Sequence, residues 1–141
     1  MSNLQEFLLD MNNLQEFLLE ASVEDCIKEI LVSERLKGNG FKIKAMSNEQ
    51  YKRFQKLCIS QKNGKRHFND SKMKEMMLIE CVVEPNFSDA AWIQKAGCAT
   101  PEQLLNKVLL PGEIERIVGE ISELSGFGQD LEQAVEEAKN C

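Results

Sequence analysis

Residues 81–127 read CVVEPNFSDAAWIQKAGCATPEQLLNKVLLPGEIERIVGEISELSGF. Prolines and glycines divide this stretch into short segments whose apolar residues recur at helical spacing. Ser88 and Thr100 occupy expected N-cap positions, and Pro101 and Pro111 suit the first turn of a helix. We therefore predict three short helices, the last of which carries a long apolar stripe. The stripe consists of Ile114, Ile117, Val118, Ile121 and Leu124.

Residues 27–46 are the candidate for β-structure. Apolar side chains occupy every second position from residue 41 to 45, which is the period of a half-buried strand. The turn Gly38-Asn39-Gly40 suits a tight reversal, so residues 29–36 are predicted as the other strand of a hairpin. An isolated hairpin is only marginally stable in water, so it must pack on helices. The predicted fold is α+β, a predominantly helical single domain with an N-terminal β-hairpin packed on the helices.

Two further helices are predicted in the middle of the chain. Ser47 and Gln50 form a capping-box pattern for a helix that runs to about residue 59. Residues 61–69 contain Asn63-Gly64 and indicate a loop or a second small hairpin. A buried helix then begins at residue 70 or 71 and stops before Pro85. It carries three methionines, Met73, Met76 and Met77.

The N-terminus holds a tandem repeat, MSNLQEFLLD followed by MNNLQEFLLE. In the second copy Phe17 and Leu18 lie on one helical face with Leu14. This segment is either a redundant N-terminal extension or an exposed apolar helix that docks on a partner. We divide the chain into residues 1–20, a central domain of residues 21–127, and an acidic C-terminal helix or tail of residues 128–141.

The overall composition is that of a soluble globular protein in a reducing cytoplasm. The formal net charge is −6, which argues against general nucleic-acid binding. The apolar runs are too short to cross a membrane, and the five cysteines include no CxxC pair. Charge is uneven: residues 51–74 carry eight Lys or Arg and one acid, whereas residues 102–141 carry nine acids and three Lys or Arg. These regions are either solvated faces or complementary docking patches.

The sequence lacks the residue patterns of a catalytic or metal site. The pair Cys58 and His67 is the one route to nucleophilic catalysis, and nothing in the sequence supplies a third group to orient it. One histidine and scattered cysteines do not make a zinc site, which needs paired ligands at short spacing. We therefore predict a protein that is not an enzyme and takes no cofactor or metal.

Several apolar residues are candidates for partner binding. Trp92 is either a half-buried core anchor or an interface hot spot. Met73, Met76 and Met77 are either core filler or the lining of an adaptable groove for an apolar helix. The full set of candidate partner-binding residues is Phe17, Leu18, Met73, Met77, Trp92, Ile117 and Ile121.

The order and spacing of several short pieces resemble the PBSX/XkdN-type tail assembly chaperones of long-tailed bacteriophages. The pieces are CVVEP at 81–85, NFSDA at 86–90, LLPGEI at 109–114 and SGF at 125–127, with NLQEFLLE at 13–20 and FKIKAMSNEQYKRF at 41–54. The resemblance extends from about residue 11 to residue 127. The doubled N-terminus and the short glycine-rich turn at residues 38–40 depart from the family pattern.

The resemblance implies a role in phage tail assembly. Such proteins bind the long, helical, aggregation-prone tape measure protein in the host bacterial cytoplasm and help tail-tube subunits assemble around it. The family has no catalytic residues to transfer. The expected partners are thus the tape measure protein and tail tube subunits, with a homo-oligomer also possible. The alternative is a structural tail component, such as a tail completion or tube-associated subunit, that stays in the virion.

Overall fold

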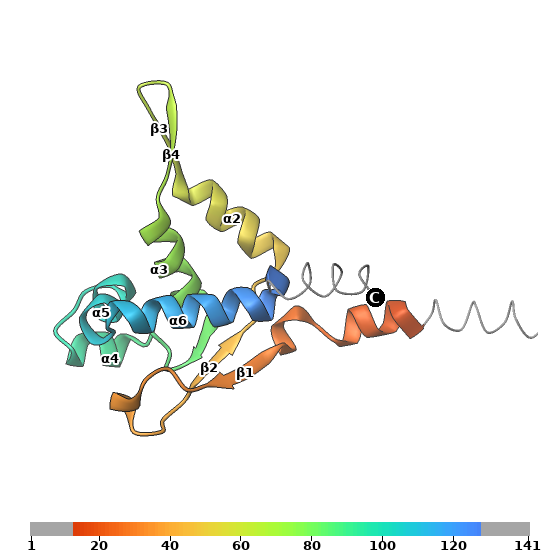
Figure 1. The fold of residues 1–141 in the computed structure, drawn as a ribbon, viewed down its shortest axis with the longest axis horizontal. Helices are drawn as coiled ribbons and strands as arrows, with labels where there is room; N and C mark the ends of the chain where they lie inside the picture. The colour runs from red at the N-terminus through yellow and green to blue at the C-terminus, as the bar shows by residue number, and fades with distance from the viewer. Residues whose placement is uncertain (1–12, 128–141) are drawn as a thin grey trace, which may run out of the picture.

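The computed structural model describes residues 13–127 of the chain (Figure 1). The first repeat copy and the predicted C-terminal helix lie outside the described residues. Residues 13–20 are helical, and the elements that follow are η1 (Val23–Asp25), β1 (Ile27–Ile30), η2 (Glu34–Leu36), β2 (Phe41–Lys44), α2 (Asn48–Cys58), β3 (Ile59–Lys62), β4 (Lys65–Phe68), α3 (Asp70–Cys81), β5 (Val82–Glu84), α4 (Ala90–Lys95), α5 (Pro101–Val108), α6 (Pro111–Ser122) and η3 (Glu123–Phe127). The predicted α+β class is confirmed.

A three-stranded antiparallel sheet has the order β1-β2-β5. Strands β1 and β2 pair in register from Ile27 with Lys44 to Ile30 with Phe41. Their connection spans residues 31–40 and includes the 3-10 turn η2, whereas the sequence predicted a tight turn at residues 38–40. Gly40 closes this connection beside β1, where an added β-carbon would lie 2.9 Å from the carbonyl oxygen of Ile30. The strand predicted over residues 29–36 is therefore wrong from residue 31 onward, because β1 ends at Ile30 and residues 34–36 form the turn η2.

Strand β5 was missed by the sequence prediction, which extended the preceding helix almost to Pro85. Helix α3 ends at Cys81, and Val82 and Glu84 pair with β2 instead. The β-branched Val82 and Val83 favour a strand, and Val82 is buried beside Ile43 in the core cluster. A third strand therefore comes from the middle of the chain and fixes the sheet to the end of α3.

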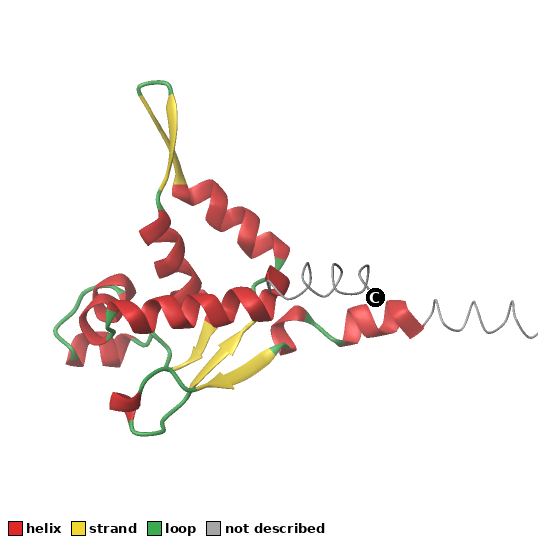
Figure 2. Cartoon of the chain, in the orientation of Figure 1, coloured by secondary structure: helices red, strands yellow, loops and turns green. Residues whose placement is uncertain are grey.

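The hydrophobic core lies between the sheet and the helices. Figure 2 shows the sheet at one side of the domain, with α2, α3 and α6 on the other side. The fully buried side chains that join these layers are Ile43, Phe54, Cys58, Leu78, Cys81, Phe87, Leu104, Leu105, Ile117 and Ile121. Within residues 13–127, no helix is long and apolar enough to span a membrane.

The C-terminal helices begin close to their predicted positions. The hydroxyl of Thr100 accepts a hydrogen bond from the Gln103 amide at 3.1 Å, and Pro101 opens α5. Pro111 likewise opens α6. For α4, the N-cap is Asp89, whose carboxylate accepts from the Ala91 amide at 3.0 Å, and not the predicted Ser88. Asp and Ser are comparable N-caps, so the sequence alone does not separate neighbouring candidates.

The strands β3 and β4 form a second hairpin that projects from the domain beyond α2 and α3 (Figure 1). Its turn residues Asn63 and Gly64 both have positive φ, of 55° and 75°, as a type I′ turn requires. All eight strand residues are exposed. Of the two possibilities left open for residues 61–69, the hairpin is therefore the one that forms.

We expect Ser47→Ala to lower the free energy of unfolding by about 1 kcal/mol. The Ser47 hydroxyl accepts from the Gln50 amide at 3.1 Å, and the Gln50 side chain accepts from the Ser47 amide at 3.0 Å, so the predicted capping box is confirmed. Urea denaturation would measure the loss. Ser60→Ala on the exposed strand β3 is the control, and equal effects of both substitutions would contradict the prediction.

Candidate partner-binding groove

A groove open to solvent lies among α2, α3, α6 and the base of the β3–β4 hairpin, and its volume is about 280 Å³. We call it the methionine groove. Its apolar lining consists of Met46, Tyr51, Phe68, Met73, Met77, Val118 and Phe127, and its polar lining of Asp70, Lys74 and Ser122. Cavities that hold drug-sized molecules are typically about 300–1,000 Å³, so this smaller open groove suits the side chains of a polypeptide.

Helix α3 supplies the floor of the methionine groove. The Asn69 side chain accepts from the Lys72 amide at 3.1 Å and so fixes the start of this helix. Met73 and Met77 are four residues apart, hence on one face, and their sulfurs and flexible side chains adapt to partners of varied shape. Both are mostly buried, with exposed fractions of 9% and 4%. They therefore serve the core and also line the groove, which joins the two alternatives left open by the sequence.

Aromatic side chains form the sides of the methionine groove. The rings of Tyr51 and Phe127 are in tilted contact, with 5.1 Å between their centroids. Phe68, at the end of the β3–β4 hairpin, and Phe127 are each about half exposed. Covering a half-exposed phenyl ring with a partner is favourable, because it removes apolar surface from water. These rings therefore leave apolar surface exposed at the sides of the groove.

A charged cluster lies at one edge of the methionine groove. The Lys74 ammonium lies 3.0 Å from the Asp70 carboxylate and 2.5 Å from that of Glu115. Hydrogen bonding to these two carboxylates raises the pKa of Lys74. The cluster connects α3 to α6 and holds the Lys74 ammonium at the edge of the groove. The charged groups therefore lie between the apolar lining and solvent.

The other predicted partner-binding residues lie away from this groove. Phe17 and Leu18 are 67% and 71% exposed on the helical residues 13–20. Trp92 is half-buried and stacks on Phe87 with 5.4 Å between ring centroids. Ile117 and Ile121 are completely buried and have no surface to offer a partner in this conformation. Their stripe on α6 faces the core, and the neighbouring Val118 is the α6 residue of the stripe that reaches the groove.

The prediction missed several groove residues, namely Met46, Tyr51, Phe68 and Phe127. Each comes from a different element, and none has a local pattern that distinguishes it from an ordinary surface residue. They meet because the chain folds α2 and α3 on either side of the hairpin and returns η3 beside them. A sequence signal exists for the two α3 methionines alone, through their helical spacing.

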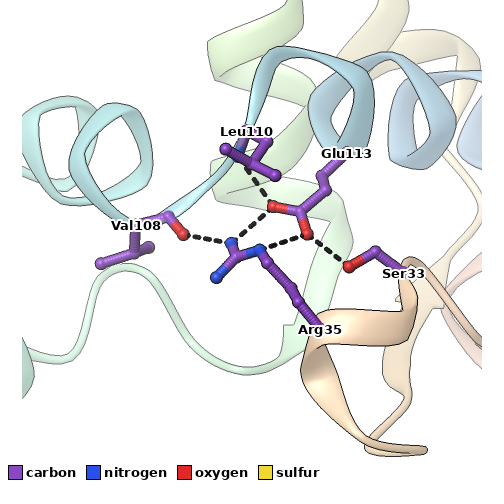
Figure 3. Close-up of polar contacts among 5 residues, drawn as sticks. All are labelled: Ser33, Arg35, Val108, Leu110 and Glu113. Carbon is purple, nitrogen blue, oxygen red and sulfur yellow. Dashed lines mark hydrogen bonds and ion pairs between the residues drawn. The ribbon is translucent and has the colours of Figure 1, made fainter.

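An ion pair between the exposed Arg35 and the buried Glu113 fixes the β1–β2 connection to the start of α6 (Figure 3). Arg35 donates from Nε and Nη2 to the two carboxylate oxygens of Glu113, at 2.7 and 2.6 Å. The Ser33 hydroxyl and the Leu110 amide also donate to this carboxylate, each at 2.7 Å. Arg35 further donates to the Val108 carbonyl. The Glu113 side chain is 3% exposed, and the Arg35 hydrogen bonds hold its pKa at about 2.

The Arg35–Glu113 pair has the geometry of a contact that stabilises the fold. Each oxygen of the Glu113 carboxylate already accepts two hydrogen bonds, so the carboxylate is fully used within the fold. It connects residues 33–35 of the β1–β2 connection to the first turn of α6. The sequence prediction missed this pair, because Arg35 and Glu113 are 78 residues apart.

The candidate nucleophile does not have the environment of one. Cys58 is buried, with its sulfur 4.0 Å from that of Met76, and desolvation raises its thiol pKa. A reactive cysteine needs a lowered pKa, because the thiolate is the nucleophile. His67 is exposed on β4. Among residues 13–127, no group of three or more His, Cys, Asp or Glu side chains is placed to hold a metal ion.

Residues 14–139 match a protein-family model described as the phage XkdN-like tail assembly chaperone protein. A search of curated proteins found no significant match. Among solved structures, the chain is similar to the crystal structure of the protein yqbn, with a TM-score of 0.58 and 20% sequence identity over 72% of this chain and 85% of that one. At that identity, the similarity shows the fold alone.

Proposed function

Because the chain belongs to the phage XkdN-like family of tail assembly chaperones, we propose that it binds the tape measure protein and assists tail tube assembly in the host cytoplasm. The methionine groove is the observation that carries this proposal. A long helical partner presents repeated apolar faces of varied sequence, and a methionine-lined groove adapts to such variety. The protein acts as a binder and not as an enzyme.

The helical residues 13–20 provide a second contact for the same partner. Four large apolar side chains, Leu14, Phe17, Leu18 and Leu19, are each at least 60% exposed there. Exposed apolar groups gathered in one short helix favour association with an apolar surface. The net charge of −6 keeps a protein with such surface soluble. Phe17 and Leu18 are therefore proposed to contact the tape measure protein outside the groove.

The groove half of this proposal is tested with the double variant F68D/F127D. Charges at these positions oppose burial of an apolar partner, so co-expression with a phage tape measure protein should leave most of that protein insoluble. The matched control is L57D/L110D, which adds the same charge at side chains of nearly equal exposure, 50% and 53% against 51% and 53%. Neither control residue lines the methionine groove. The soluble fraction of the tape measure protein is the measurement.

Four outcomes would each contradict part of the proposed function. A tape measure protein equally soluble with F68D/F127D and with L57D/L110D removes the groove from the proposal. A tape measure protein that precipitates equally with and without the wild-type chain removes the chaperone function. F17S/L18S tests the second contact in the same assay, and no loss of solubility would confine binding to the groove. Stoichiometric presence of the chain in purified virions, measured by mass spectrometry, would favour a structural tail component instead.

A further inference from the structure

We propose that residues 128–141 of the same chain occupy the methionine groove and compete there with the partner. The proposal rests on the proposed function for the identity of the competitor, but the contact between tail and groove is tested independently of it. The groove thus has a resident occupant that an arriving apolar helix must displace.

The position of the last described residue places this segment at the groove. Phe127 lines the methionine groove and contacts Tyr51, so the chain continues directly from its side. The exit is held in place because the Ser125 hydroxyl accepts from the Met46 amide at 2.8 Å and donates to the Ile121 carbonyl at 2.6 Å. Gly126 has φ of 94°, which allows the chain to turn back at this point. Any segment that follows starts within reach of the groove.

The sequence of the segment matches an apolar groove. Its apolar residues are Leu131, Ala134, Val135 and Ala138, which recur at i, i+3, i+4 and i+7, the pattern of one helical face. Fourteen residues at 1.5 Å each give a helix of about 21 Å, long enough to lie across a groove between neighbouring helices. Alanines in this stripe let such a helix approach closely. The apolar pattern of the segment therefore suits binding to an apolar groove.

Charge complementarity favours this occupant. Residues 128–141 carry four acids and one Lys, whereas residues 51–74, which supply half of the residues that line the groove, carry eight Lys or Arg and one acid. Six of those cations make no ion pair within residues 13–127, namely Lys52, Lys56, Lys62, Lys65, Arg66 and Lys72. An acidic helix with one apolar face brings anions toward these cations while its apolar face meets the methionines.

The test uses the full chain with ¹³C-methyl-labelled methionine and NMR. L131D/V135D places two charges in the apolar stripe, and Q129D/Q133D adds the same charge outside that stripe. We expect L131D/V135D to shift the methyl resonances of Met46, Met73 and Met77 and to leave Met76, which does not line the groove, in place. Q129D/Q133D should leave all four unchanged. Identical spectra for L131D/V135D and the wild type would overturn the proposal.

Two further measurements distinguish failure of the tail contact from failure of the proposed function. Affinity for a tape measure fragment should rise about tenfold in L131D/V135D if the tail fills the groove some nine-tenths of the time. If no variant binds the fragment while the methyl shifts appear, the proposed function fails and the tail contact stands. If L131D/V135D leaves the methyl resonances in place while the fragment binds normally, the tail contact fails and the proposed function stands. Methyl shifts that depend on protein concentration in the wild type would assign the tail to a second copy and overturn the contact within one chain.

Discussion

Phe87→Ala is expected to lower the free energy of unfolding by about 3–5 kcal/mol, because it removes a large side chain from a packed core. Phe87 is completely buried. Its ring lies 5.4 Å from that of Trp92 and 6.4 Å from that of Phe41, so one side chain joins β2 to the start of the C-terminal helices. Truncation leaves a cavity that these rigid rings cannot close. Guanidinium denaturation at neutral pH measures the loss.

Phe68→Ala is the matched control for Phe87→Ala. The chemical change is the same, but Phe68 is half exposed, so its loss should stay within about 1 kcal/mol. Equal losses at the two positions would mean that the Phe87 cluster is not the centre of the core. Trp92→Ala then decides the role of Trp92: a loss of stability without loss of partner binding marks a core anchor, and the reverse marks an interface residue.

The helix pattern of the C-terminal half was predictable because its signals are local. Thr100 and Pro101 determine the start of α5 within one turn of the chain, and the same holds for Ser47 and α2. A cap acts on amides two or three residues away, so a single sequence contains the whole interaction. Even the Asn63-Gly64 turn was identified as a possible hairpin on local evidence.

The features that sequence reasoning missed depend on distant residues. Strand β5 forms because β2, some 40 residues earlier, offers it an edge, and the Val82–Glu84 run alone could equally have ended a helix. The Arg35–Glu113 pair spans 78 residues, with no periodicity that announces it. Long-range pairing of this kind is set by the whole fold and not by local propensity.

The candidate site was predictable in part. The sequence offered Met73, Met76 and Met77 as core filler or groove lining, and the structure places Met73 and Met77, but not Met76, in the methionine groove. The stripe on α6 was correctly placed on a helix, but Ile117 and Ile121 are buried because the most apolar face turns to the core. A sequence gives the apolar face of a helix and does not say whether a neighbour or solvent covers it.

Glu113→Gln is expected to lower the free energy of unfolding at neutral pH by about 1.5–3 kcal/mol, the range for hydrogen bonds to charged groups. The substitution keeps the shape of the side chain but removes the negative charge to which Arg35, Ser33 and the Leu110 amide donate hydrogen bonds. It also puts an amide donor against the donors that now face a carboxylate. Thermal or urea denaturation of both proteins gives the difference.

The size of this difference should depend on pH in a defined direction. The Glu113 pKa is held at about 2 in the folded protein, below its ordinary value of 4.5, chiefly by the Arg35 hydrogen bonds. A depressed folded pKa stabilises the protein above the unfolded pKa, and that contribution is lost as pH falls toward the folded one. The gap between wild type and Glu113→Gln should therefore be full above about pH 5 and shrink toward zero near pH 2.

An exposed carboxylate in the first turn of α5 provides the control for this pH dependence. Glu102→Gln removes one negative charge near a helix N-terminus, as Glu113→Gln does, but Glu102 is exposed. Its effect should stay within about 0.5 kcal/mol at every pH. A gap for Glu113→Gln that stays constant from pH 7 to pH 2 would show that the lost stability comes from packing and not from the ionised carboxylate. Such a result would leave Arg35 without its role as the residue that fixes the β1–β2 connection to α6.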